Sequence, residues 1–130
     1  MGLNVYFVNE NGVELSEDNI QDFSRYNLQI THNLNKILIA LDKKSGNFTM
    51  FYETIWRADE LLNVENGKIP VKEILCRLTA IIESLIFNEK ELSKHLPENG
   101  YGTYRGLIKF LTDYLYLCYI YKDYYIYLCR

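Results

Sequence analysis

The sequence predicts a single α+β domain, residues 1–130, in which a small antiparallel sheet packs against several amphipathic helices. Three observations indicate this class. Residues 3–8 alternate in hydrophobicity with the period of a strand, the middle of the chain repeats apolar residues at helical spacing, and residues 124–129 are rich in strand-forming residues. We therefore expect the last strand to pair with an N-terminal hairpin while the helices cover one face of the sheet.

The N-terminal hairpin is predicted from a strand, a turn and a return strand. Leu3, Val5 and Phe7 share one face of the first strand. Residues 9–12 then tolerate the positive φ of a tight turn, so residues 13–15 are expected to return beside the first strand. Residues 20–26 fit either a short third strand or an irregular crossover.

The first two predicted helices follow this segment. Helical spacing of apolar residues starts at Ile30, and Lys43 and Lys44 carry charges that complement the C-terminus of a helix. Gly46 can adopt the left-handed conformation that ends it. A second helix is expected over residues 48–62, because its apolar residues again fall on one face.

Three further helices are predicted before the last strand. Pro70 suits a first helical turn, and the apolar residues that follow it up to residue 85 form the strongest amphipathic pattern of the chain. A short polar helix is expected over residues 88–95. Residues 104–118 carry another apolar stripe, so they are expected to form the last helix.

Charge and hydropathy limit the partners that this chain is expected to have. The formal net charge is −3 and the pI about 5.4, so there is no basic excess to bind a DNA or RNA duplex or an anionic membrane surface. The longest apolar run, residues 114–121, is much shorter than the roughly 20 residues that cross a bilayer. Cys76, Cys118 and Cys129 lack metal-binding spacing and are expected to be buried thiols of a cytosolic protein.

The residues of known catalytic motifs are missing from the sequence. There is no phosphate-binding loop, no serine-hydrolase elbow, and no second ligand at metal-binding spacing from His32 or His95. We therefore expect no enzymatic activity, no cofactor and no metal site. Acidic residues alternate with basic ones along the predicted helices, which is typical of solvated helix faces. These carboxylates are Glu53, Asp59, Glu60, Glu83, Glu89 and Glu91.

A first polar motif lies at residues 27–36, where hydrogen-bonding side chains are more frequent than a helix start requires. One or two of them can cap the helix, because their oxygens accept an unpaired backbone N–H. The others can present donors and acceptors to a ligand. The candidate ligand-binding residues here are Thr31, His32, Asn33 and Asn35.

A second motif lies at residues 97–106, where glycines and tyrosines precede a helix. The glycines can serve the turn alone. Alternatively, the free N–H groups of the helix start together with Arg105 can hold an anion such as phosphate, and Tyr101 or Tyr104 can stack on a ring. The candidate ligand-binding residues of this motif are Asn99, Tyr101, Tyr104 and Arg105.

Tyrosines are frequent near the end of the chain. Seven of the 12 tyrosines fall within residues 114–127. Most are expected at the edge of the core or in the last strand, since their rings suit half-buried positions. A subset on the outer face would favour a homo-oligomer, because exposed aromatic surface and an unpaired strand edge both invite a partner.

These two motifs, together with residues 55–61, resemble a family of small uncharacterised bacteriophage and prophage proteins, and the likeness covers most of the chain. The family motifs read N-[IY]-T-[HS]-N, L-W-R-P-E-E-L and N-P-E-N-G-W-G-x-Y-x-G. Here Ala58, Leu96 and Tyr101 stand where the family has Pro, Asn and Trp. The resemblance implies phage biology in the cytosol of a bacterial host, with no assigned activity.

Two functional hypotheses follow. In the first, the protein is a non-enzymatic phage accessory protein that binds a small anionic ligand between the two motifs, sequestering a host nucleotide immune signal. Arg57 and Trp56 are reserve candidates for that site. In the second, it is a protein-interaction module that inhibits a host defence protein such as a nuclease.

Overall fold

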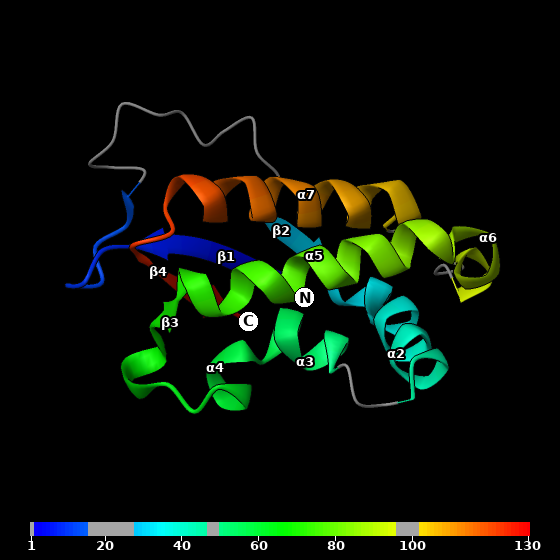
Figure 1. Cartoon of the computed structure of the whole chain (residues 1–130), viewed down its shortest axis with the longest axis horizontal. Coiled ribbons are helices and arrows are strands. Elements are labelled where there is room, and N and C mark those ends of the chain that lie inside the picture. The colour runs from blue at the N-terminus through cyan, green and yellow to red at the C-terminus, as the bar shows by residue number, and fades with distance from the viewer. Residues whose placement is uncertain (1, 16–27, 47–49, 96–101) are drawn as a thin grey trace.

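The computed structural model of the chain describes residues 2–15, 28–46, 50–95 and 102–130. These residues form a four-stranded antiparallel sheet with helices packed on one of its faces (Figure 1). The predicted α+β class is therefore confirmed. Among the described helices, none is both long and apolar enough to cross a bilayer.

Within the described residues, the chain forms strands, helices and short 3-10 turns. The strands are β1 (Gly2–Val8), β2 (Gln29–Thr31), β3 (Ile69–Pro70) and β4 (Tyr125–Cys129). The helices are α2 (Asn35–Lys44), α3 (Phe51–Trp56), α4 (Ala58–Leu61), α5 (Val71–Phe87), α6 (Glu89–Leu92) and α7 (Tyr104–Ile120). The 3-10 turns are His32–Leu34, Glu65–Gly67 and Ser93–His95.

The order of strands across the sheet is β2-β1-β4-β3, so the first and last strands of the chain form its centre. They pair without interruption from Asn4 opposite Cys129 to Val8 opposite Tyr125. The predicted pairing of the terminal strand with the N-terminal strand is therefore confirmed.

The predicted return strand of the hairpin is wrong. Residues 13–15 make a single bridge, between Val8 and Glu14, and β2 pairs with Gly2, Leu3 and Asn4 at the start of β1 instead. The turn itself forms: Gly12 has φ 80°, and the Asn9 side chain accepts hydrogen bonds from the backbone N–H groups of Asn11 and Val13 at 2.9 and 3.0 Å. The backbone N–H of Val13 is thus bonded to the Asn9 side chain and is not available to extend the pairing of the two strands. Residues 20–26 lie outside the described residues.

The helix predicted from Ile30 starts five residues later, at Asn35. Ile30 instead pairs with Leu3 in the sheet and is 4% exposed, so the apolar residue that suggested a helix is a core residue of β2. The helix predicted over residues 48–62 is broken into α3 and α4 at Arg57, whose φ of −139° is not helical.

The later elements agree better with their predictions. α5, α6 with the 3-10 turn after it, α7 and β4 lie where expected. Pro70, however, belongs to the short strand β3 and precedes α5 instead of lying in its first turn. Its missing N–H is tolerated there because β3 lies at the edge of the sheet.

The core lies between the sheet and the helices. Leu3, Val5 and Phe7 of β1 are buried. The helices α5 and α7 lie side by side over the sheet (Figure 1). Phe7 contacts the fully buried Tyr114 edge-on, with ring centroids 6.2 Å apart. The opposite face of the sheet carries the alternate residues of the same strands and remains accessible.

The prediction that all three cysteines are buried is wrong for two of them. Cys118 is buried in α7, and burial raises the pKa of its thiol. Cys76 lies on the solvent side of α5, and Cys129 lies at an outward position of β4, so both are exposed. Periodicity within their own segments places both away from the core.

Two carboxylates hold the small helices in place. Asp42 of α2 accepts hydrogen bonds from the backbone N–H groups of Phe51 and Tyr52 at 2.7 and 3.1 Å, and so caps the start of α3 from another helix. Asp59, expected to be a solvated residue, instead forms two hydrogen bonds with Arg130, at 2.8 and 2.9 Å. Arg130 also donates to the carbonyl of Trp56, at 2.7 Å.

We predict that the pair between Asp59 and Arg130 makes stability depend on acidic pH. The hydrogen bonds from Arg130 lower the pKa of Asp59 below its ordinary value of 3.8. A group whose pKa is lowered on folding stabilises the protein above its unfolded pKa, and that stabilisation is lost as the pH falls through the folded pKa. Between about pH 5 and pH 2, the free energy of unfolding should therefore fall less steeply in Asp59→Asn than in the wild type.

Urea unfolding across this pH range measures the effect. Glu83→Gln, at an exposed position of α5, is the control and should follow the wild type. Arg130→Met should lower stability by about 2 kcal/mol at neutral pH, because it removes charged hydrogen bonds to two groups. Equal slopes in Asp59→Asn and the wild type would contradict the role given to this pair.

Candidate functional site

The first polar motif lies where β2 passes into α2. Thr31 ends β2, and its hydroxyl accepts a hydrogen bond from the backbone N–H of Asn33 at 3.3 Å, so it caps the 3-10 turn. His32 is exposed and Asn33 is half-buried. The Oδ1 atom of Asn35 is buried and has no hydrogen-bond partner among the described residues. Capping therefore explains Thr31, but not the other polar residues.

The second motif is described from Gly102 onward, so Asn99 and Tyr101 lie outside the described residues. Tyr104 is 4% exposed, its hydroxyl donates to the carbonyl of Leu85, and burial raises its pKa to about 12. The expectation that Tyr104 stacks on a ligand is therefore wrong, because its ring has no accessible face. Arg105 is exposed and forms an ion pair with Glu89 at 3.2 Å.

The two motifs meet at Gly102. This glycine has φ 95°, and a Cβ atom placed on it would lie 2.9 Å from Cγ of Leu34 and 3.0 Å from the Thr31 methyl group. A hollow of about 360 Å³ adjoins Thr31 and is lined by Gly2, Gln29 and Ile30 as well. The two motifs are thus neighbours. Their contact in the described structure is between Gly102 and the apolar atoms of Leu34 and Thr31, and not between polar groups.

The reserve candidates lie at the break between α3 and α4. Trp56 is buried, with 7% of its surface exposed, and its Nε1 atom has no hydrogen-bond partner among the described residues. Arg57 is exposed and lies 3.8 Å from a carboxylate oxygen of Glu60. This segment has a structural role, because the Trp56 carbonyl accepts the hydrogen bond from Arg130.

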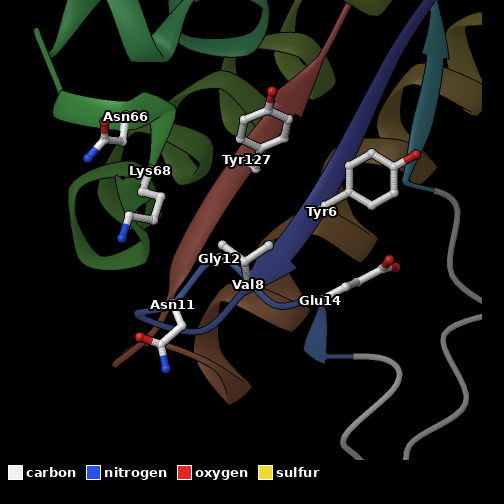
Figure 2. Close-up of a pocket in the computed structure, with 8 residues that line it drawn as sticks. All are labelled: Tyr6, Val8, Asn11, Gly12, Glu14, Asn66, Lys68 and Tyr127. Carbon is white, nitrogen blue, oxygen red and sulfur yellow. The ribbon is translucent and has the colours of Figure 1, made fainter.

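A larger pocket, which the sequence motifs do not predict, lies on the accessible face of the sheet (Figure 2). Its volume of about 500 Å³ falls within the usual range for small-molecule sites. Side chains from two strands and two turns line it. They are Tyr6, Val8, Asn11, Gly12, Glu14, Asn66, Lys68 and Tyr127.

The base of the pocket is formed by the central strands. Tyr6 of β1 and Tyr127 of β4 are directly opposite each other across the strand pair, so both side chains project from the same face. Val8, two residues after Tyr6, projects from that face as well and is 5% exposed. Tyr127 is 46% exposed, so an aromatic ring remains available to a ligand beside a buried apolar side chain.

One wall of the pocket is the turn before β3. Asn66 and Gly67 both have positive φ, and a Cβ atom on Gly67 would lie 3.3 Å from the ring of Tyr127. Glycine therefore favours the close approach of the turn to Tyr127, because a side chain here would be strained at this φ and would crowd the ring. This approach places Asn66 and Lys68 beside the pocket, as Figure 2 shows.

Lys68 connects this wall to the turn that follows β1. Its Nζ atom donates a hydrogen bond to the carbonyl of Glu10 at 2.6 Å and lies 5.7 Å from the centre of the Tyr125 ring. Because an ammonium group has three donors, the contact with Glu10 does not exhaust its capacity. Lys68 is therefore a fixed positive charge at one side of the pocket.

Glu14 provides the opposite side. Val8 pairs with Tyr125 of β4 on one side and with Glu14 on the other, so Glu14 and β4 flank β1. The pocket thus has an ammonium group beyond β4, a carboxylate beyond β1 and tyrosines between them (Figure 2). No group of three or more His, Cys, Asp or Glu suited to a metal ion occurs in the described parts of the chain.

Comparison of the chain with protein-family models, with curated proteins and with solved structures gives no match.

We predict that Gly102→Ala destabilises the protein by about 2 to 4 kcal/mol, because the new methyl group meets Leu34 and Thr31 in a backbone conformation that alanine disfavours. Gly12→Ala is the matched control. Gly12 has φ 80° but no atom within 4 Å of its added Cβ, so this variant should show only the backbone cost of about 1 kcal/mol. Equal losses of stability in urea unfolding would contradict the packing of Gly102 against the first motif.

Proposed function

We propose that this protein is a non-enzymatic binder of a small anionic ligand, and that the pocket on the accessible face of the sheet is its site. The observation that carries this proposal is the convergence of Tyr6, Tyr127 and Lys68 on one cavity of about 500 Å³. Aromatic rings supply contact area for a ligand, and an ammonium group supplies attraction for a negative charge. These groups are suited to holding a ligand.

The resemblance to small phage proteins gives this proposal a biological setting. A protein that captures a host nucleotide signal in the bacterial cytosol acts by stoichiometry and needs no turnover. Its ligand is released intact when the protein unfolds. Under this proposal the protein is an anti-defence protein, and the concentration of free signal falls in proportion to the number of sites.

A protein-interaction module that inhibits a host defence protein, such as a nuclease, is the second candidate. The observation that favours it is the exposure of several large aromatic side chains away from the pocket. Phe87 at the end of α5 is 86% exposed, and Tyr116 and Tyr119 of α7 are 50% and 58% exposed. Large exposed aromatic side chains are typical of surfaces that bind another protein or a second copy of the same chain.

Thermal unfolding with a panel of nucleotides, sugar phosphates and aromatic acids tests the leading proposal. A ligand at a hundredfold excess over its Kd should stabilise the wild type by about 2.7 kcal/mol. Tyr127→Ala should lose most of this gain, because it removes the aromatic surface at the centre of the pocket. Tyr119→Ala removes another exposed tyrosine, from α7, and should respond like the wild type.

The same panel distinguishes the pocket from the meeting point of the two sequence motifs. If Arg105→Ala and Asn33→Ala lose the stabilisation while Tyr127→Ala retains it, the ligand binds at the motifs and the assignment of the pocket is wrong. Chemical analysis of the ligand after denaturation completes the test. Recovery of a converted product would contradict a non-enzymatic function.

A further inference from the structure

The ammonium group of Lys68 is not paired with a carboxylate of the described residues. Its Nζ atom bonds to the backbone carbonyl of Glu10 and lies near the Tyr125 ring, and it makes no ion pair within the described parts of the chain. Arg130, by contrast, is paired with Asp59. Lys68 is also half-buried, so its charge is screened less by solvent than that of an exposed lysine. Its charge is therefore available to an anion from outside.

The pocket offers this one positive charge. Lys68 is the only Lys, Arg or His among the described residues that line it. Asn11 and Asn66 come from the turns on either side, and their side-chain amides can donate hydrogen bonds without adding charge. A second negative charge on the ligand would meet no cation here, and the net charge of −3 of the chain adds repulsion. The pocket therefore favours a monoanion over a polyanion.

The aromatic surface lies next to this charge. Tyr125 and Tyr127 are two residues apart in β4, so their side chains project from the same face of the sheet. The Nζ atom of Lys68 lies 5.7 Å from the centre of the Tyr125 ring, and the preceding Gly67 approaches the ring of Tyr127. Tyr6, opposite Tyr127, extends the aromatic surface across to β1. A ligand that uses both features therefore needs its ring and its charged group close together.

The ammonium group is held in place by two turns. It donates to the Glu10 carbonyl at 2.6 Å, and the turn that contains Glu10 is itself fixed by hydrogen bonds to the Asn9 side chain. A side chain that is already fixed loses less conformational freedom when a ligand binds. An anionic group can therefore bind the remaining donors of Lys68 at a small entropic cost.

We infer that the ligand of this pocket is a flat ring that bears a single negative charge, with the ring on Tyr6 and Tyr127 and the charged group at Lys68. This inference rests on the proposed function and names the ligand class for the same site. Two kinds of compound share this chemistry. One is an aromatic carboxylate, and the other is a nucleoside whose phosphate is a cyclic diester.

The test is calorimetric titration of the full chain at about pH 8 with two series of compounds, each of which varies the charge on one ring system. The first is adenosine, cyclic 3′,5′-adenosine monophosphate and adenosine 5′-monophosphate, whose negative charge rises from none to one to about two. The second is 2-naphthamide, 2-naphthoate and naphthalene-2,3-dicarboxylate, with the same progression.

In at least one series the singly charged compound should bind at least about tenfold more tightly than the neutral one, because it gains a charged hydrogen bond to Lys68. The doubly charged compound should bind more weakly than the singly charged one. The series that shows this maximum identifies the source of the ligand, a nucleotide or an aromatic acid. If in both series the neutral or the doubly charged compound binds as tightly as the singly charged one, the inference is wrong.

Variants of Lys68 assign the charge preference to this residue. Lys68→Gln removes the charge but keeps a donor for the Glu10 carbonyl, so the singly charged and neutral compounds should then bind within about twofold of each other. Lys68→Arg keeps the charge and should keep the preference. Lys90→Gln, at an exposed position of α6, is the matched control and should bind like the wild type. A preference that persists in Lys68→Gln would overturn the inference.

Two outcomes separate this inference from the proposed function. If a compound outside the singly charged class stabilises the protein and Tyr127→Ala abolishes that effect, the pocket is a binding site but the ligand class is wrong. If no compound of the panel or of the two series stabilises the wild type, both the proposed function and this inference fail.

Discussion

The antiparallel pairing of β1 with β4 is the interaction on which the rest of the structure depends. It brings the first and last described strands together in the middle of the sheet. Its register also decides which side chains of the two strands face the helices and which face the other side. Phe7 and Ile126 are opposite each other on the buried face, while Tyr6 and Tyr127 are opposite each other on the accessible one. A shift of this register by one residue would exchange the two faces, so the core and the pocket depend on the same register.

The fold was largely predictable from the sequence, because most of its elements show their own period. The apolar stripes of α5 and α7 and the alternation of β1 and β4 are local signals that packing then reinforces. The errors arose where tertiary contacts decide. Ile30 fits a helical stripe, but its pairing with Leu3 makes it part of a strand. The local sequence pattern does not distinguish an isoleucine in a helix from an isoleucine in a strand at this position.

The pocket could not be predicted in the same way, since its residues come from four separate segments of the chain. Tyr6 and Tyr127 become neighbours only through the strand pairing, and Lys68 joins them where the turn containing Gly67 approaches Tyr127. The sequence motifs, by contrast, are contiguous and therefore conspicuous. In the described structure part of their polarity has a local purpose, as the cap formed by Thr31 shows. Dense polar residues in one segment therefore need not mark a pocket, which here depends on the register of the sheet.

The central position of β4 also has a consequence for how the protein is made. During synthesis β1 leaves the ribosome well before β4, its main partner, because more than a hundred residues separate the two strands. Until then, one hydrogen-bonding edge of β1 lacks its final partner, a state that favours aggregation or chaperone binding. Closing so long a loop is slow compared with forming local helices, so the sheet is expected to assemble after translation reaches β4.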